Sequence, residues 1–358
     1  MTLDTVRIDG AMGEGGGQVL RTALTLAMLT GRPLEMVNVR ANRPKPGLQP
    51  QHLTALRAAA EICAADTRGD SLGSSRLTFT PRRKPASGEY RFDVRDAANG
   101  SSAGATTLIC QTVLLPLAFA GESSTVTLLG GTHVPFSPPF EYLQEVYLPA
   151  LASLGIRSEA RLLSRGWYPA GGGHWVLAVE PITMLPARTW TDRGELQRIS
   201  GIGVATNLPS HIPQRMVNRA ANLLAELQVP CDLRPLRERS KAPGAGIFVL
   251  AEYDGARALC SALGRPGKPA EQVAEEACRA LLALHRTGTN VAVDPYLGDQ
   301  LILPLSLATG ESVFTTATAS SHLLTNIQVV QHFLNASIRV EQSAGRAMIT
   351  VRGDGFHV

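Results

Sequence analysis

The sequence predicts an α+β fold of three repeated modules, each a four-stranded sheet with two helices, plus a smaller inserted α/β domain. Three observations carry this prediction. The order helix, strand, polar loop, helix occurs three times, and a segment of different pattern interrupts it between the second and third occurrence. The chain has 358 residues, which is long enough for a large core and two domains.

The repeat is clearest where the first helix of each module ends. Residues 114–123 and 303–312 share a leucine-rich pattern that stops at Gly-Glu-Ser, and residues 24–31 form a weaker third copy. A glycine at this place is typical of a helix C-terminus. A strand and then a second helix follow each copy. The strands are residues 34–40, 125–129 and 313–317, and the second helices begin at His52, Phe140 and His322.

The loops that join strands and helices can also be identified in the first module. Residues 6–9 alternate as a short strand and lead into a glycine-rich loop, residues 10–18. The first helix is predicted over residues 19–30. A proline-stiffened basic loop, residues 41–52, then precedes the helix of residues 53–65.

The pattern breaks between residue 188 and about residue 284, which we interpret as an inserted domain. The strands predicted there are residues 199–204 and 247–251, the helices are residues 213–227 and 270–283, and residues 234–246 are predicted to be a charged loop. The expected division is therefore residues 1–185 for the first part of the main domain, 186–284 for the insertion, and 285–358 for the last part.

The composition of the chain limits which classes of function are compatible with it. Hydrophobic residues make up 44% and charged residues 18%, which is typical of a soluble globular protein. The net charge of +4 is compatible with an anionic substrate, but it is far from that of a basic tail or an arginine-rich arm. The apolar run of residues 108–120 contains Gln111 and Pro116 and is too short to span a membrane.

The cysteines indicate a reducing environment. They form no CxxC pair, they lie in apolar patterns, and no secretory leader precedes them. We therefore expect reduced packing residues in a cytoplasmic protein, at Cys63, Cys110, Cys231, Cys260 and Cys278.

His322 stands where a predicted strand gives way to a predicted helix, within the hydroxyl-rich stretch of residues 318–326. Free N–H groups at a helix start favour anions and disfavour imidazolium, so a histidine there tends to stay neutral and can act as a nucleophile. The same N–H groups would stabilise an anionic phosphoryl adduct. On this stretch alone, a surface or packing role is the more frequent alternative.

Two loops carry groups suited to phosphate. In residues 13–21 the glycines permit close backbone approach, Glu14 could hold a divalent ion, and Arg21 lies one turn into the helix. No GK[ST] sequence follows, so the loop is not a Walker motif, and a plain glycine turn is the alternative. The basic loop suits a terminal phosphate or an RNA backbone, although a merely solvated loop is equally compatible with its charges. Its polar residues are Arg40, Arg43, Lys45, Gln51 and His52.

Residues 294–300 open the helix that runs to Leu307. Tyr296 can stack on a base, Asp299 can bind ribose hydroxyls or a metal, and Gln300 can form hydrogen bonds. The alternative is a simple helix cap by Asp294. Upstream, the small and hydroxyl-rich residues 99–107 precede Gln111, a polar residue on an apolar helix that should have a specific partner.

Taken together, residues 13–21, 40–52, 130–132, 166–173, 296–300 and 321–326 resemble the RNA 3′-terminal phosphate cyclase family, in its catalytic bacterial and archaeal type. The resemblance covers nearly the whole chain. It implies an ATP-dependent ligase that converts an RNA 3′-phosphate end to a 2′,3′-cyclic phosphodiester and releases AMP and pyrophosphate. The implied route has three steps, through a histidine-linked AMP at His322 and an RNA-adenylate.

The resemblance also implies roles for other residues. A divalent metal, Mg or Mn, would be held at Glu14, and the adenine pocket would be lined by Pro138 and Tyr142. The family's ATP-binding positions match Gln111, Tyr296, Leu297, Gly298, Asp299 and Gln300, and the substrate phosphates would face Arg21, Arg40, Arg43 and His52. The expected partner is RNA with a 3′-phosphate end, and the oligomeric state is left open, a homodimer included.

The chain departs from the family pattern at two places. His133 follows Gly130-Gly131-Thr132 where many relatives have Asp or Asn, and the loop of residues 99–107 is longer than expected. Two other functions are compatible with similar repeats. A non-catalytic ribosome-biogenesis factor would lack the histidine that this chain has at position 322, and a carboxyvinyl-transfer enzyme would need a different basic site and no adenylylation.

Overall fold

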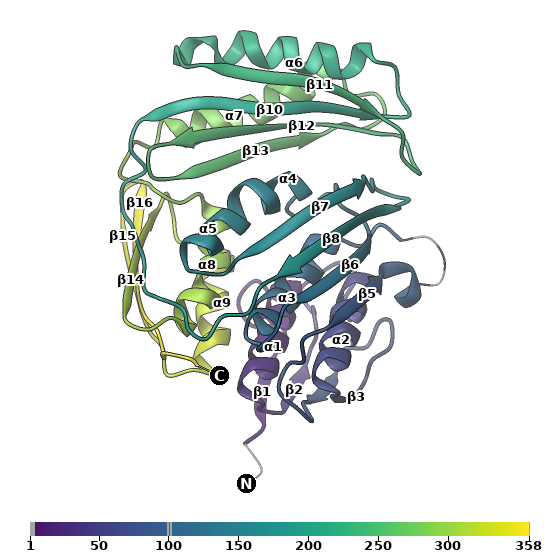
Figure 1. The fold of residues 1–358 in the computed structure, drawn as a ribbon, viewed down its shortest axis with the longest axis vertical. Helices are drawn as coiled ribbons and strands as arrows, with labels where there is room; N and C mark the ends of the chain where they lie inside the picture. Colours follow the sequence, from purple (N-terminus) through teal and green to yellow (C-terminus); the bar gives the residue numbers. More distant parts are fainter. Residues whose placement is uncertain (1–3, 99, 101, 358) are drawn as a thin grey trace.

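The structure, a computed structural model, describes residues 4–98, 100 and 102–357. It contains four four-stranded sheets with helices packed on them (Figure 1), and this confirms the predicted α+β fold class. Three of the sheets share one strand-pairing scheme. The first strand runs parallel to the second, the second is antiparallel to the fourth, and the third pairs only with the fourth.

The first module has the strand order β1-β2-β4-β3. Its predicted strand at residues 34–40 ends at Val37, because Asn38 and Arg40 have positive φ angles that turn the chain out of the sheet. Gly31 ends the first helix in the left-handed region, as the sequence predicts. The elements are β1 (Val6–Asp9), α1 (Gly17–Thr30), β2 (Leu34–Val37), α2 (Pro50–Cys63), β3 (Asp66–Arg68) and β4 (Leu77–Thr80).

The second module has the order β5-β6-β8-β7. The helix predicted to begin at Phe140 is present, but a π-helical turn lies within it, a feature that is rare and often found near functional sites. The elements are β5 (Glu89–Asp93), η1 (Val94–Ala97), α3 (Thr106–Ala118), β6 (Ser124–Gly130), α4 (Phe140–Tyr142), η2 (Leu143–Tyr147), α5 (Leu148–Ser153), β7 (Ser158–Ser164) and β8 (Gly173–Val179).

The third module is split by the insertion. Its first strand, β9, precedes the insertion and pairs with β14 after it, in the order β15-β16-β14-β9. The elements are β9 (Thr189–Trp190), α8 (Pro295–Leu307), β14 (Glu311–Thr316), α9 (Ser321–Gln331), β15 (Ser337–Ser343) and β16 (Arg346–Arg352).

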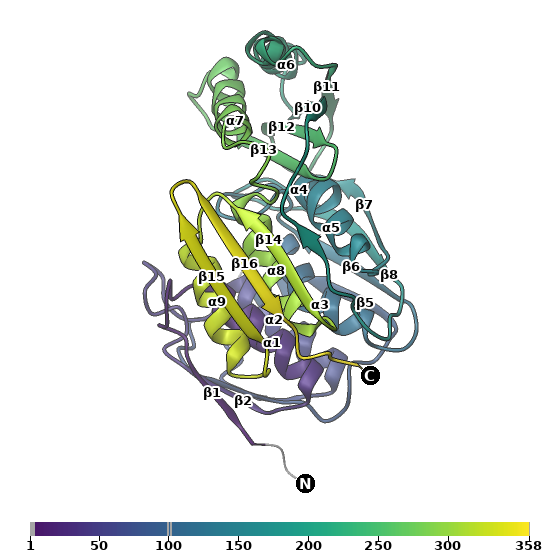
Figure 2. The ribbon, with the colours of Figure 1, turned by 90° about the vertical axis from the view of Figure 1, so that its left-hand side faces the viewer.

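The residues between β9 and α8 form the fourth sheet, β11-β10-β12-β13, with α6 and α7 on one face (Figure 2) and a hydrophobic cluster of their own. The charged loop predicted at residues 234–246 is shorter than expected. Residues 234–238 continue a strand because they pair with β10 from Ile202 to Thr206. The elements are β10 (Leu196–Thr206), α6 (His211–Leu224), η3 (Ala225–Leu227), β11 (Cys231–Glu238), β12 (Gly244–Tyr253), β13 (Arg257–Leu263) and α7 (Ala270–His285).

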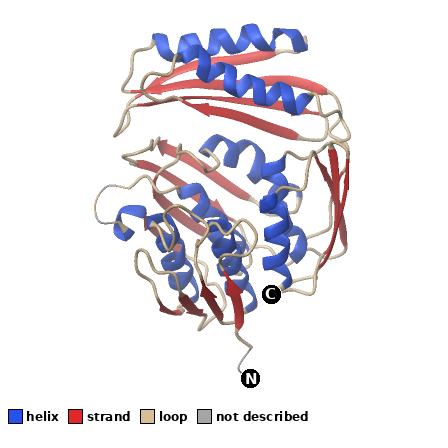
Figure 3. Ribbon diagram, turned by 180° about the vertical axis from the view of Figure 1, so that it is seen from behind, coloured by secondary structure: helices blue, strands red, loops and turns tan. Residues whose placement is uncertain are grey.

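The helices of the three modules pack against one another between the sheets (Figure 3), and one hydrophobic cluster joins all three modules. Helix α1 contacts α2, α3 and α9, and α8 contacts α9. This arrangement brings helix starts from different modules together, which positions the candidate site.

The five cysteines form no disulfide, as predicted. Cys63, Cys110 and Cys278 are buried packing residues, whereas Cys260 is half-buried. Cys231 begins β11 with its side chain exposed, so the expectation of a packing role is wrong there. Within the described part of the chain, no helix is long and apolar enough to cross a membrane.

Candidate active site

The starts of α1, α2 and α9 meet around the glycine-rich loop. The backbone N–H of Glu14 donates to Thr325 Oγ1 at 3.1 Å, and Gln18 and His322 are joined by a 2.8 Å hydrogen bond. A Cβ on Gly17 would overlap the Nε2 of His52, so only glycine permits this approach of α1 to α2. Three helix N-termini thus face one place, where their free N–H groups favour an anion.

His322 lies at the strand-to-helix junction that the sequence predicts, between β14 and α9. Ser320 caps α9 by accepting from the N–H of Leu323 at 3.0 Å. The His322 side chain is 46% exposed, so it is accessible to a substrate. Partial burial and the cationic Arg43 and Arg21 lower the pKa of His322 below its ordinary value, which keeps the imidazole neutral.

Glu14 lies beside this histidine. Its Oε2 is paired with Arg43, and its Oε1 is 3.5 Å from His322 Nδ1. The side chain is only 7% exposed, and Oε1 has no hydrogen-bond partner in the part of the chain that the structure describes. Among the described residues no group of three or more His, Cys, Asp or Glu could hold a metal, so Glu14 would be a lone carboxylate ligand.

Two arginines, Arg21 and Arg40, lie with His52 near the glycine-rich loop. Burial and the neighbouring Arg40 lower the pKa of Arg21 to about 10, and burial, Arg40 and Arg21 lower the pKa of His52 well below its ordinary value. Within the described residues, neither Arg21 nor Arg40 is paired with a carboxylate. These two half-buried arginines lack a compensating charge, and a phosphate would supply it.

Arg40 and His52 are held by backbone groups. The Arg40 Nη1 donates to the carbonyls of Lys45 at 2.7 Å and Gly47 at 2.8 Å, which shapes the basic loop. The Nδ1 of His52 accepts from the N–H of Gln49 at 3.3 Å. In a neutral ring the proton of His52 is therefore on Nε2, which can donate to a ligand.

A second group of candidate ligand-binding residues lies at the start of α8. The Tyr142 hydroxyl donates to Asp294, whose two carboxylate oxygens lie 3.0 Å from it. Asp294 caps α8 by accepting from the N–H of Tyr296 at 2.9 Å and of Leu297 at 3.1 Å, so the simple cap proposed as the alternative does exist. Burial raises the pKa of Asp294 to about 6.

The two tyrosines differ in accessibility. Tyr142 is buried, whereas Tyr296 is 71% exposed, and their rings meet edge to face with centroids 6.5 Å apart. Tyr296 therefore presents a free aromatic face that a base could stack on. Pro138 is half-buried in the loop before α4, where its carbonyl accepts from Thr107 Oγ1 at 2.8 Å.

The remaining predicted ATP-binding residues divide into accessible and buried ones. Gln111 donates through Nε2 to Gln300 Oε1 at 2.8 Å, so the partner expected for Gln111 is another amide of the site. Leu297 and Gly298 are buried against the core. Asp299 is also buried, accepts from the Ser320 hydroxyl, and has its pKa raised by burial to about 7.

Polar contacts that the sequence interpretation did not assign connect the two groups. The Nδ2 of Asn326 donates to the carbonyl of Asp299 at 2.8 Å, and Thr22 Oγ1 donates to Asn326 Oδ1 at 2.6 Å. Gln18 contacts His322 in the same interface between α1 and α9. The available signal was the presence of polar residues on apolar helices, because such residues usually have specific partners when buried.

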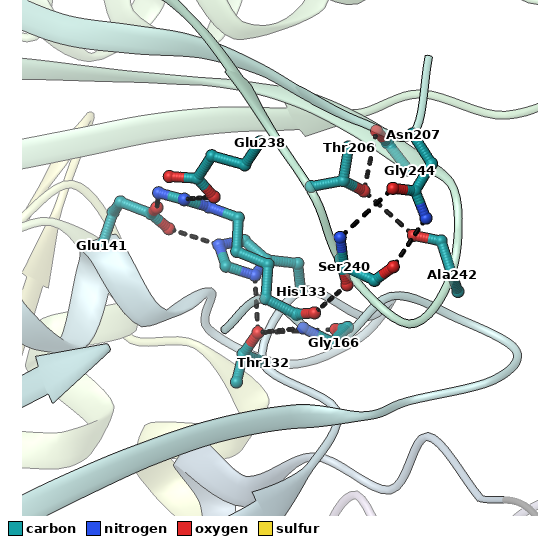
Figure 4. Close-up of polar contacts among 11 residues, drawn as sticks. Thr132, His133, Glu141, Gly166, Thr206, Asn207, Glu238, Ser240, Ala242 and Gly244 are labelled. Carbon is teal, nitrogen blue, oxygen red and sulfur yellow. Dashed lines mark hydrogen bonds and ion pairs between the residues drawn. The ribbon is translucent and has the colours of Figure 1, made fainter. Parts of the chain in front are cut away.

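His133, the departure from the family pattern, is fully buried in a chain of polar groups (Figure 4). Its Nε2 is 2.6 Å from Glu141 Oε2, and Arg165 donates to Glu141 Oε1 at 2.9 Å and also pairs with Glu238 of β11. Burial opposes ionisation of Glu141, but His133 and Arg165 lower its pKa to about 2. This cluster links the second module to the fourth sheet.

Two other predicted segments lie near this cluster. Residues 166–172, which belong to the family resemblance, connect β7 to β8, and Trp167 packs on His133 with centroids 4.7 Å apart. Of the loop at residues 99–107, Asn99 and Ser101 lie outside the described residues. The N–H of Ala105 donates to Gln51 Oε1 at 2.8 Å, which joins this loop to the start of α2.

Comparison with known proteins shows the family of the chain. The family model described as RNA 3′-terminal phosphate cyclase matches residues 12–340. The chain is 50% identical to the RNA 3′-terminal phosphate cyclase of Gloeothece citriformis over 92% of this chain and 94% of that protein. It is 48% identical to that of Methylococcus capsulatus over 99% and 98%, and 38% identical to that of Pyrobaculum aerophilum over 98% and 99%. The chain belongs to the RNA 3′-terminal phosphate cyclase family.

Proposed function

We propose that this enzyme converts the 3′-phosphate end of RNA to a 2′,3′-cyclic phosphodiester, with ATP consumption and with His322 as the nucleophile. The family implies the cyclase activity and the use of ATP. The observation that carries the mechanism is the half-exposed His322, with a lowered pKa, at a meeting point of three helix starts.

In the first step the neutral imidazole of His322 attacks the α-phosphorus of ATP. A P–N bond forms, and the bond from the α-phosphorus to the leaving oxygen breaks and releases pyrophosphate. The helix N-termini would stabilise the negative charge that develops on the phosphoryl oxygens. His322 needs no base, because it begins the reaction unprotonated.

In the second step an oxygen of the RNA 3′-phosphate attacks the phosphorus of the histidine-linked AMP, and the P–N bond breaks. In the third step the 2′-hydroxyl attacks the 3′-phosphorus, loses its proton, and expels AMP. We assign the RNA phosphate to Arg21, Arg40, Arg43 and His52, where cations outnumber carboxylates and His52 presents a donor at Nε2.

The ATP subsite would extend from His322 to the start of α8. Tyr296 offers an exposed ring, Tyr142 meets that ring edge to face, and the Gln111–Gln300 pair offers amide groups. We assign Pro138, in the loop before α4, to the lining of the adenine pocket. Asp299 would act mainly through Ser320, the residue that caps α9 and whose hydroxyl donates to Asp299. The buried Leu297 and Gly298 would shape the ATP subsite.

Glu14 fits a divalent metal, Mg or Mn, because its buried Oε1 has no hydrogen-bond partner. Mg²⁺ is commonly held by one or two carboxylates together with substrate phosphates, so a lone carboxylate is sufficient. The metal would neutralise charge on the triphosphate. Glu14 would hold the metal, and Arg43, with which it pairs in this structure, would face the RNA phosphate.

We also propose that residues 186–284 form a separate inserted domain, which a hydrophobic cluster of its own supports, and that the protein is cytoplasmic. The non-catalytic ribosome-biogenesis factor remains the alternative function. It is less well supported, because such a factor would not require an accessible histidine with a lowered pKa between arginines.

The test is cyclisation of a short RNA that ends in a 3′-phosphate, in the presence of ATP and a divalent metal. The wild-type protein should make the end resistant to phosphatase, and His322→Ala should not. His211→Ala, which removes an exposed histidine at the start of α6, is the matched control and should be fully active. An active His322→Ala variant would refute the mechanism, and an inactive wild type would favour the non-catalytic alternative.

A further inference from the structure

We propose that Gln18 is a positioning residue that holds His322 in the Nδ1–H tautomer and thereby directs the lone pair of Nε2 at the phosphorus. This inference rests on the proposed function of His322. It adds a role for a residue of the glycine-rich loop segment to which neither the sequence patterns nor the resemblance assigns one.

The first observation is the contact itself. Gln18 Oε1 lies 2.8 Å from His322 Nδ1, which is the distance of a good hydrogen bond. An amide oxygen only accepts, and a neutral imidazole has one N–H donor and one acceptor nitrogen. The proton must therefore be on Nδ1, and Nε2 carries the free lone pair.

The second observation is the place of Glu14. Its Oε1 lies 3.5 Å from the same Nδ1 atom, is buried, and has no hydrogen-bond partner among the described residues. A carboxylate oxygen cannot donate, and a lone pair on Nδ1 would repel it. The assignment rests on the closer contact with Gln18, and Glu14 favours the same Nδ1–H form.

The third observation concerns how the ring is aimed. Gln18 and Thr22 are four residues apart on α1, and His322 and Asn326 are four residues apart on α9. Residues at this spacing lie on one helix face, so the contacts Gln18–His322 and Thr22–Asn326 form two successive links between the helices. The buried 2.6 Å Thr22–Asn326 link fixes the helix spacing, and Gln18 orients the ring above it.

A neutral amide suits this role better than a carboxylate. Glu14 is already paired with Arg43, which limits how far its charge stabilises the imidazolium. A second carboxylate at position 18 would favour the protonated ring and remove the nucleophile. Gln18 selects the tautomer without adding charge, and it still does so when Glu14 binds a metal.

The direct test is ¹⁵N NMR of the histidines, with His322 assigned by comparison with His322→Ala. The wild-type protein should show a protonated Nδ1 and an unprotonated Nε2 at His322. Gln18→Leu, which is similar in size but has no acceptor, should shift the population toward Nε2–H, the form that free histidine prefers. Gln18→Glu keeps an acceptor and should restore the Nδ1–H signal in the neutral ring.

Kinetics provide the second readout. Gln18→Leu should lower the kcat of self-adenylylation about 10- to 100-fold with little change in the KM for ATP, because orientation and not binding is lost. Gln214→Leu, on the exposed face of α6, is the control and should change neither kcat nor KM. Melting curves would show whether each variant is folded.

The outcomes separate this inference from the proposed function. An Nε2–H tautomer in the wild type, or an unchanged tautomer and kcat in Gln18→Leu, would overturn the role of Gln18. If the wild type shows Nδ1–H but never binds AMP covalently, the proposed function fails and the positioning role fails with it. If Gln18→Leu lowers kcat without moving the NMR signals, Gln18 acts through packing and the tautomer claim is wrong.

Discussion

At the scale of single residues, the chemistry depends on the protonation of one imidazole. Partial burial, Arg43 and Arg21 all lower the pKa of His322. Glu14 pairs with Arg43 and offsets only part of the positive charge of the two arginines. Since a lowered pKa keeps histidine neutral at more acidic pH, self-adenylylation should remain active below the usual range for a histidine nucleophile.

Removing Arg43 should reverse part of this effect. Without its charge the imidazolium is less disfavoured and Glu14 loses its ion-pair partner, so the pKa of His322 rises in Arg43→Ala. The acidic limb of the pH–rate profile of self-adenylylation should therefore move to higher pH, while the plateau rate changes little. Arg7→Ala, an exposed arginine on β1, serves as control. An unmoved limb in Arg43→Ala would contradict the electrostatic assignment.

At the scale of elements, the glycine-rich loop must lie close to α9. Gly13 has a φ of 55°, and a Cβ there would overlap Thr325 Oγ1, which accepts from the N–H of Glu14. Gly13→Ala should cost about 1–3 kcal/mol of unfolding free energy and lower self-adenylylation at least about tenfold. Urea unfolding and the labelling rate would measure both.

Gly73 provides the matched control for this substitution. It has a φ of 77°, but nothing lies within 4 Å of its Cβ position. Gly73→Ala should lower the free energy of unfolding only because alanine disfavours a positive φ angle, and it should keep full activity. If Gly13→Ala were as active as Gly73→Ala, the close approach of the loop to α9 would not matter for catalysis.

The link between the second module and the fourth sheet is also a property of elements. Arg165 is buried between Glu141 and Glu238, so Arg165→Leu leaves Glu141 with His133 as its remaining partner. Breaking such a buried pair should cost about 3–5 kcal/mol, measured as a lower urea midpoint. Arg215→Leu, which breaks the exposed pair with Glu271, should leave the midpoint nearly unchanged. Equal midpoints for the two variants would show that the buried cluster is not stabilising.

At the scale of the whole molecule, local patterns predicted the elements but not how they meet. The similar helix ends at residues 114–123 and 303–312 revealed the modules, because a glycine stop is a local signal. The junction at His322 was predicted from another local signal, the change from a strand pattern to apolar residues at helical spacing. Strand ends were less certain, since the turn after Val37 depends on positive φ at Asn38.

Contacts between distant residues could not be predicted in this way. The Gln18–His322 and Thr22–Asn326 pairs each join residues 304 positions apart, and their register depends on how α1 packs against α9. The buried cluster at His133 also depends on tertiary structure, because Arg165 follows β7 of the second module and Glu238 ends β11 of the fourth sheet. The family resemblance indicated which residues belong to the site, whereas the structure supplied the partners that orient them.

The central claim is that AMP becomes covalently attached to His322. The most direct measurement is the mass of the intact protein after incubation with ATP and a divalent metal but without RNA, followed by mapping of the modified peptide. The account predicts a gain of one AMP moiety at His322, stable to base, lost in mild acid, and absent from His322→Ala. An unmodified wild type, or an adduct that persists in His322→Ala, would contradict it.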